Sequence, residues 1–195
     1  MKTSAPGLRC ARLEGEQYDL LPFTEELISE RYIGWLNNPE VNQFLEVRFQ
    51  TQTQETVRSF VRSFYQETEK YMWGIFPKGE VEPVGTATLQ SISRHHGGSG
   101  EIGLMIGKKD YWGRGASMEA MKLVMRFGFM ELGLRRFTGG CYAPNSGMSF
   151  TFKRLGFRLE GKLVKAFAVS SGQYVDGYRW GILREEWDPL NATNI

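Results

Sequence analysis

The sequence contains very little cysteine and histidine, and this scarcity argues against several kinds of site. The two cysteines, Cys10 and Cys141, lie far apart, and the two histidines, His95 and His96, are adjacent. This spacing does not match a zinc site, and no Asp and Ser accompany the histidines in the pattern of a catalytic triad. We therefore expect no metal, and interpret both cysteines as free thiols in a reducing, cytoplasmic compartment.

Long apolar runs and an excess of one charge are also missing. No apolar stretch approaches the roughly 20 residues that a membrane span requires, and residues 1–7 lack the apolar core of an export signal. The 24 Lys and Arg residues nearly balance the 22 Asp and Glu residues, and the two signs are interspersed. The sequence therefore predicts no membrane segment and no nucleic-acid partner.

The remaining composition is that of a globular protein. Apolar residues make up 41% of the 195 residues, and aromatic residues make up 13%. That is enough for a core and for an aromatic-lined pocket. We expect one domain over residues 1–195, with its core from about residue 8 to 187, and a homodimer is left open.

Hydrophobic periodicity predicts the order of the elements. Strands are expected at 8–13, 71–76, 84–92, 101–107, 135–142, 157–169 and 177–186, and helices at 24–36, 54–69, 115–132 and 145–155. Residues 41–49 fit either a short helix or a loop. Thr24 and the pair Thr51 and Gln54 are predicted helix caps. The strand–helix–strand unit over 101–142 implies one parallel strand pair in an otherwise antiparallel sheet, so the fold class is mixed α/β. The two strands of this pair must splay apart, or the space between them must be filled.

A glycine-rich turn lies between the strand at 101–107 and the helix that follows it. The first amides of a helix have no internal partner, and the helix dipole adds positive charge, so such a turn binds anions. Gly113 and Gly115 leave room for a phosphate, and Arg114 between them can add a charge. We predict that residues 112–117 hold the pyrophosphate of a nucleotide-containing cofactor. An ordinary glycine-rich turn is the alternative.

Three blocks of the chain resemble the GCN5-related N-acetyltransferases, and most of all the branch that includes the ribosomal-protein N-terminal acetyltransferases. Residues 112–117 are similar to the family's pyrophosphate loop, although Trp112 replaces the usual Gln or Arg. Asn145 followed by Gly156 and Phe157 has the spacing of the family's second block, and residues 176–187 look like its last strand. The resemblance covers about residues 8–187 and implies this family's fold, acetyl-CoA as co-substrate, and direct acyl transfer to an amine.

The resemblance also assigns the cofactor contacts. The pantetheine arm would lie along the strand at 101–107 and pair with its backbone. The cofactor-binding residues implied in this way are Leu104, Met105, Ile106, Trp112, Gly113, Arg114, Gly115, Ala116, Ser117, Asn145 and Phe152. A backbone amide in this strand can also polarise the thioester carbonyl.

Candidate residues for the acceptor side are fewer. Direct transfer needs a neutral amine, so a group must take its proton, and Glu101 at the start of the central strand is the best candidate base. A surface glutamate paired with a Lys or Arg is the alternative for it. Arg48 lies where this branch's acceptor pocket tends to be, and is a candidate partner for an acceptor carboxylate or phosphate, with a surface salt bridge as the alternative. His96 is a candidate acceptor contact, or else a solvated loop histidine.

The sequence lacks the hydroxyl residue expected to protonate the departing thiolate. Met148 stands where Ser is common in the family, and Phe152 stands where many members carry Tyr. The favoured function is still an acetyl-CoA-dependent N-acetyltransferase whose acceptor is a small amine, such as an amino sugar carried on a nucleotide, or a protein N-terminus. The alternatives are an acyl-CoA-binding sensor or interaction module with little or no catalysis, and a nucleotide-binding protein unrelated to CoA.

Overall fold

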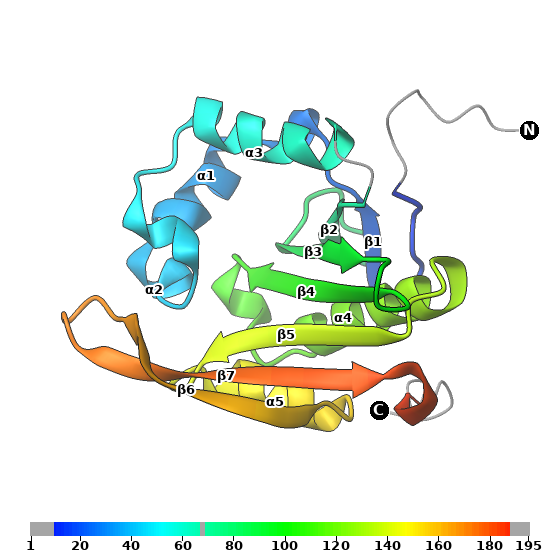
Figure 1. The fold of residues 1–195 in the computed structure, drawn as a ribbon. Helices are drawn as coiled ribbons and strands as arrows, with labels where there is room; N and C mark the ends of the chain where they lie inside the picture. Colours follow the sequence, from blue (N-terminus) through cyan, green and yellow to red (C-terminus); the bar gives the residue numbers. More distant parts are fainter. Residues whose placement is uncertain (1–9, 67–68, 188–195) are drawn as a thin grey trace, which may run out of the picture.

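The computed structural model of the protein describes residues 10–66 and 69–187, and it contains a seven-stranded sheet flanked by helices (Figure 1). The strand order is β1-β2-β3-β4-β5-β7-β6. All neighbouring strands are antiparallel except β4 and β5, which are parallel. The predicted mixed α/β sheet with one parallel pair is therefore confirmed. The strands are β1 (Tyr18–Pro22), β2 (Tyr71–Pro77), β3 (Gly85–Ser93), β4 (Ser99–Ile106), β5 (Arg136–Tyr142), β6 (Arg158–Ala168) and β7 (Tyr174–Leu183).

The helices pack on both faces of the sheet (Figure 1). One face carries α1 (Glu30–Asn37), α2 (Pro39–Asn42) and α3 (Gln54–Gln66), and the other carries α4 (Ala116–Arg126) and α5 (Ser146–Arg154). Two apolar clusters follow from this arrangement, because each strand sends alternate side chains to opposite faces. Met72 and Met105 join the cluster with α1 and α3, whereas Trp73 and Phe137 join the cluster with α4 and α5.

The parallel pairing between β4 and β5 is short. It runs from Ser99 opposite Arg136 to Glu101 opposite Thr138, and the pairing between the two strands ends there. β5 continues to Tyr142 beside β7, and β4 continues to Ile106 beside β3. The splayed parallel pair that the sequence predicts is thus present, and it opens beyond Glu101.

The N-terminal part of the chain differs from the prediction. No strand is formed by the described residues of the predicted segment 8–13, of which 8 and 9 lie outside the described residues; Leu13 makes a single bridge to Leu20. The edge strand is β1 instead. The chain turns back between Leu13 and β1, and Asp19 on β1 pairs with Arg12 and Lys78. The described apolar residues of the segment, Cys10 and Leu13, pack against the core without forming a strand.

The predicted caps were wrong by a few residues. The helix expected from Thr24 is interrupted: residues 25–27 form a 3-10 turn, and Ser29 caps α1 by accepting a hydrogen bond from Tyr32 N at 3.2 Å. For α3, Thr53 and Thr56 exchange side-chain-to-backbone hydrogen bonds at the helix start, in place of the predicted Thr51 and Gln54 pair. The undecided segment 41–49 contains the end of α2 and the 3-10 turn η2 (Glu46–Phe49).

Candidate active site

The glycine-rich turn opens directly in front of α4. Gly113 and Gly115 both have positive φ angles, of 74° and 79°, and Gly115 is the N-cap of α4 in the left-handed conformation. A Cβ built on either glycine would meet no other atom within 4 Å. The backbone therefore faces open space at a helix N-terminus, and it fits the pyrophosphate of a nucleotide-containing cofactor.

A carboxylate on the first turn of α4 anchors this helix to the N-terminal segment. Glu119 Oε1 accepts hydrogen bonds from three successive backbone N–H groups, those of Glu16, Gln17 and Tyr18, at 2.5, 2.9 and 3.2 Å. The Tyr18 hydroxyl also donates to the carbonyl oxygen of Arg114 at 3.1 Å. Residues 16–18, about a hundred positions earlier in the chain, thus hold the glycine-rich turn and the start of α4 in place. Sequence reasoning missed this role, because an acidic residue in a first helical turn also fits a simple dipole effect.

Beyond Glu101, β4 and β5 separate, and we call the gap between them the splay. Every second residue of β4 directs its backbone N–H and C=O groups toward this gap. Gly107 N donates to Val84 O at 2.9 Å. Because directly bonded pairs alternate along an antiparallel ladder, the bonded pairs include Thr86 with Met105 in this register. The N–H and C=O of Met105 therefore face β3, whereas those of the predicted cofactor contacts Leu104 and Ile106 face β5.

The Trp112 side chain lies against this open edge of β4. Its indole Nε1 donates to the carbonyl oxygen of Ile106 at 2.8 Å, and the ring remains 45% exposed. Trp112 therefore fixes the start of the turn to the end of β4. The carbonyl of Ile106 is already engaged, which leaves its N–H and the backbone of Leu104 as the groups that face the splay.

Glu101 lies on the face of the sheet opposite α4, at the point where the parallel pairing ends. Its side chain is 34% exposed and pairs with Arg179 on β7, with Arg179 Nη1 at 3.2 Å from Glu101 Oε1. An ion pair of this kind is what the alternative interpretation of Glu101 predicts. It does not remove the carboxylate from the site, because a third of the side chain stays accessible.

Arg48 makes hydrogen bonds to other parts of the chain, and no carboxylate of the described residues forms a salt bridge with it. It donates to Gln43 O at 2.9 Å, to the Tyr142 hydroxyl at 3.1 Å and to the carbonyl oxygen of Ala168. Its guanidinium also stacks over the Phe49 ring, 4.4 Å from the centroid. Arg48 thus links η2 to the end of β5 and to the end of β6.

Tyr142 is the centre of this link. It is 4% exposed and donates its hydroxyl to Glu46 Oε1 at 2.6 Å. Burial, together with the hydrogen bond to the Glu46 carboxylate, raises the pKa of Tyr142 above its usual value of 10, although Arg48 acts in the opposite direction. The phenol is therefore neutral at physiological pH and acts here as a hydrogen-bond donor.

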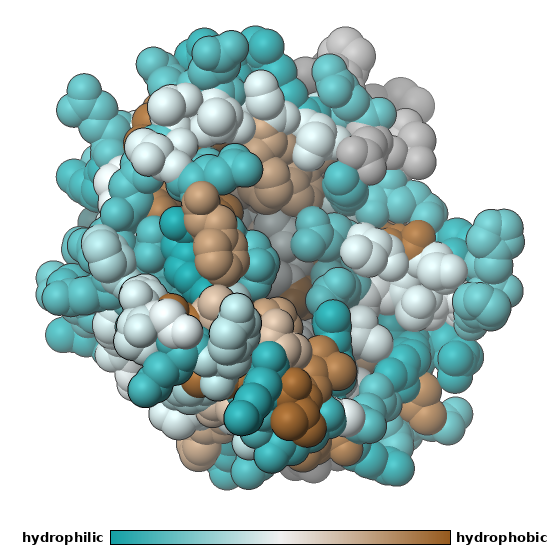
Figure 2. Space-filling model, turned by 60° about the vertical axis from the view of Figure 1, so that its left-hand side comes forward, coloured by the Kyte–Doolittle hydropathy of each residue, from teal (hydrophilic) through white to brown (hydrophobic). Residues whose placement is uncertain are grey.

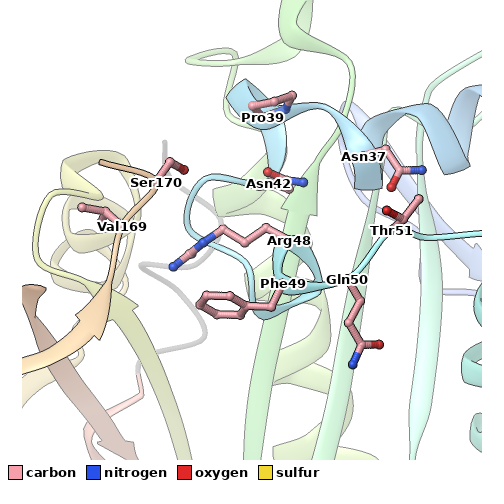
Figure 3. A pocket seen from close by; sticks show the side chains of 9 residues that line it. All are labelled: Asn37, Pro39, Asn42, Arg48, Phe49, Gln50, Thr51, Val169 and Ser170. Atoms are coloured by element: carbon pink, nitrogen blue, oxygen red, sulfur yellow. The ribbon is translucent and has the colours of Figure 1, made fainter. Parts of the chain in front are cut away.

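A cavity of about 410 Å³ lies beside Arg48, between η2 and the end of the β6–β7 hairpin (Figure 3). Figure 3 shows the Arg48 side chain extending from η2 toward Val169 and Ser170. Most of the lining side chains are polar and uncharged. The cavity is lined by Asn37, Pro39, Asn42, Arg48, Phe49, Gln50, Thr51, Val169 and Ser170.

His96 lies at the opposite end of β5 from Arg48. It is exposed in the turn before β4, and the neighbouring Gly98 accepts hydrogen bonds from the start of β5. Arg48 contacts Tyr142 at the end of that strand. A seven-residue strand spans about 20 Å, so one small acceptor cannot contact both of these candidate residues.

The helix α5 carries Asn145 and Phe152, and both have structural partners. Asn145 is the N-cap, and its Oδ1 accepts from Met148 N at 3.0 Å. Phe152 is 1% exposed and its ring packs against Trp180 and Phe157. Their cofactor contacts stay predictions that would add to these roles.

Ser149, a hydroxyl residue on α5 close in sequence to Met148, contacts β5. Its Oγ lies 3.4 Å from Cys141 Sγ. Cys141 is buried on β5, beyond the last β4–β5 pair. Within residues 10–66 and 69–187, no group of three His, Cys, Asp or Glu side chains could hold a metal ion, and no helix is long and apolar enough to cross a membrane.

Residues 19–158 match the family model of the acetyltransferase (GNAT) domain. The N-acetyltransferase YoaA of Bacillus subtilis (strain 168), described as uncharacterized, is 26% identical over 175 residues, which cover 88% of this chain and 96% of YoaA. The ribosomal protein uS5-alanine N-acetyltransferase of Escherichia coli (strain K12) is 24% identical over 129 residues, which cover 66% of each chain.

Solved structures show the same fold. RimL, a ribosomal L7/L12 alpha-N-protein acetyltransferase solved in complex with coenzyme A, superposes with a TM-score of 0.76 at 20% identity, covering 89% of this chain and 98% of that one. A GNAT-family acetyltransferase from Bacillus anthracis gives a TM-score of 0.74 at 21% identity, covering 90% and 100%. The predicted fold family is thereby confirmed.

Proposed function

The chain belongs to the GNAT acetyltransferase family, and from this we propose that it transfers an acetyl group from acetyl-CoA directly to a primary amine. One observation carries the proposal: the anion-binding turn at 112–117 and the open edge of β4 lie side by side, with Trp112 hydrogen-bonded to Ile106 between them. A single extended ligand with a pyrophosphate at one end would use both.

Each part of this surface has a role in binding. The amides at the start of α4 and the charge of Arg114 would hold the pyrophosphate. The backbone groups of Leu104 and Ile106 that face the splay would pair with the pantetheine arm as an added strand would. Acetyl-CoA would supply the activated thioester, and a backbone amide of β4 would donate to its carbonyl oxygen.

Glu101 would accept the proton of the attacking amine, directly or through one water. It stands at the last β4–β5 pair, where the splay begins, and its carboxylate is accessible from the face opposite α4. Glu101 lies near the start of β4, and the glycine-rich turn follows the end of β4, so the two lie about one strand length apart.

The acceptor is a primary amine for which two classes are supported by different observations. The uS5-alanine and L7/L12 enzymes act on protein N-termini, which favours a peptide with a free N-terminus. The polar cavity of about 410 Å³ beside Arg48 favours a small amine such as an amino sugar. The two differ in size, so one assay with both classes separates them.

The experiment is a steady-state assay of thiol release from acetyl-CoA. The acceptor panel contains peptides with N-terminal Ala or Ser and amino sugars, free and linked to a nucleoside diphosphate. Acetylation of one class, confirmed by mass spectrometry of the product, identifies the acceptor. Tight binding of CoA by titration calorimetry without turnover of any amine would contradict the enzyme and favour the sensor instead. Preference for ATP over CoA would contradict both.

The sensor alternative rests on Met148 and Phe152, which cannot donate a proton. Phe152 is part of the core, and Met148 is partly buried against it. The CoA thiolate can leave unassisted or take its proton from water. The lack of a hydroxyl group at Met148 and Phe152 therefore removes one way to protonate the leaving group and does not prevent the proposed transfer.

A further inference from the structure

Glu101 and Arg179 form an ion pair between strands that are not neighbours. Glu101 lies on β4 and Arg179 on β7, with β5 between them. Adjacent strands are about 4.8 Å apart, so the pair bridges about 10 Å across the sheet. The pair therefore crosses β5 at the place where the parallel pairing with β4 ends.

A glycine on β5 makes this crossing possible. Arg179 is directly opposite Gly140 in the β5–β7 register. A Cβ added to Gly140 would lie 3.2 Å from Arg179 Nη1 and 3.7 Å from its Cζ. The guanidinium thus lies next to the backbone of Gly140, where no side chain intervenes, and it approaches Glu101 from the side of the splay.

We propose that Arg179 is a positioning residue that holds the Glu101 carboxylate at the mouth of the splay. The proposal rests on the proposed function, in which Glu101 accepts the amine proton. A glutamate side chain has three rotatable bonds and must come within about 3 Å of that proton or of a bridging water. Arg179 Nη1, at 3.2 Å from Glu101 Oε1, restricts the carboxylate to one arrangement.

A purely structural role explains the pair less well. The two side chains are 53% and 34% exposed, and ion pairs this exposed contribute little to folding stability. Removal of Arg179 should therefore leave the fold intact, which makes a change in turnover interpretable.

The other neighbours of Glu101 on this face provide a matched control. Gln90 on β3 and Thr138 on β5 are opposite it in register, and both are uncharged. On the same face, Arg136 on β5 and Glu160 on β6 form their own ion pair across β7, next to Gly181. This second pair crosses a strand in the same way, and Arg136 donates to Glu160.

The experiment compares Arg179→Met, Arg179→Lys and Arg136→Met with the wild type, using the best acceptor from the panel of Ala- and Ser-initiated peptides and amino sugars. Arg179→Met should lower kcat about tenfold with the affinity for CoA and the KM for the acceptor little changed. Arg179→Lys should restore part of the rate, and Arg136→Met should match the wild type. In the Glu101→Gln background, Arg179→Met should have no further effect.

A second measurement needs no acceptor. With ¹³C-labelled glutamate, the Glu101 carboxyl signal is assigned from Glu101→Gln. Arg179→Met should change the chemical shift of this signal, because the carboxylate loses the partner that fixes it, whereas Arg136→Met should leave it unchanged. An unchanged Glu101 signal in Arg179→Met, or equal losses of kcat from Arg179→Met with and without Glu101→Gln, would overturn the positioning role. Wild-type rates in Glu101→Gln would instead refute the base itself, whatever Arg179 does.

Discussion

Substitution of Glu119 should weaken both the fold and CoA binding, because one carboxylate oxygen accepts hydrogen bonds from three backbone amides next to the proposed phosphate turn. Glu119 is on the first turn of α4, and the amides belong to residues 16–18. In Glu119→Ala these N–H groups lose their acceptor and α4 loses its anchor to the chain before β1. Glu119→Gln keeps an oxygen at the same place but removes the charge.

The size of the effect follows from burial. A hydrogen bond to a charged group contributes about 1.5–3 kcal/mol. Two of the three bonds are exposed, and only the bond from Tyr18 is partly buried, so water can replace most of what is lost. We expect Glu119→Ala to lower the free energy of unfolding by about 2–3 kcal/mol, and Glu119→Gln by about 1 kcal/mol. For a chain of this size the alanine variant should melt roughly 4–10 °C lower.

The assay pairs thermal unfolding with titration calorimetry of CoA. Looser support of the turn should raise the Kd for CoA about fivefold, which corresponds to about 1 kcal/mol. Glu131→Ala, an exposed glutamate at the other end of the same helical segment, is the control and should change neither value. A lower Tm with an unchanged Kd would show that the anchor does not reach the turn, and no change in either would refute the reasoning.

Other substitutions test single features of the site. Gly115→Val should weaken CoA binding at least tenfold, because φ is 79° there and the side chain would occupy the open space before α4; an unchanged Kd by calorimetry would reject the phosphate turn. Glu101→Gln should lower kcat about a hundredfold with little change in the Kd for CoA. Arg48→Met should raise KM for the acceptor more than it lowers kcat, measured by thiol release. Burial raises the pKa of Asp19, but the hydrogen bonds from Lys78, Gly15 and Arg12 lower it more, so the pKa in the folded protein is below its usual value of 3.8. The stability that the carboxylate contributes is full above that value and is lost as the pH falls through the folded pKa, so the deficit of Asp19→Asn in urea unfolding should be largest at pH 7 and should shrink as the pH falls below 3.8.

The order of strands and helices could be predicted because each carries its own local pattern. The hairpin of β2 and β3, the parallel β4 and β5 with α4 between them, and the helix α5 all lie within a few residues of their expected ranges. The parallel pair followed from connectivity alone, since a strand–helix–strand unit returns the chain in the same direction.

The errors lie where local patterns compete. Thr24 and Ser29 are both good N-caps in sequence, and only Ser29 starts a helix whose apolar side reaches Tyr32 and Leu36 in the core. The alternation at 8–13 is typical of a strand, but pairing with β2 is taken by residues 18–22. Propensity is similar in each case, and tertiary packing decides between the candidates.

The residues of the candidate site also differ in how far the sequence could predict their positions and partners. The glycine-rich turn depends on contiguous residues and a helix start, so the sequence could place Gly113 and Gly115 in a turn before α4; their binding of a phosphate stays a prediction. Glu119 acts through residues about a hundred positions away, and Arg48 through Tyr142 and Ala168. No periodicity in the chain encodes these partners, since they meet only when the sheet assembles.

The pair of Glu101 and Arg179 shows that the two interpretations of Glu101 need not exclude each other. From the sequence, Glu101 is interpreted either as a catalytic base or as a surface glutamate paired with a cation. Those interpretations exclude each other only if the ion pair makes the carboxylate inaccessible. In the structure the cation approaches over Gly140 from β7, while a third of the Glu101 side chain remains accessible at the start of the splay. A cation on that side fixes the carboxylate without covering it. The ion pair with Arg179 is therefore compatible with Glu101 as a base, because it holds the carboxylate in one place. If Arg179→Met has no effect on kcat in the Glu101→Gln background, Arg179 acts through Glu101.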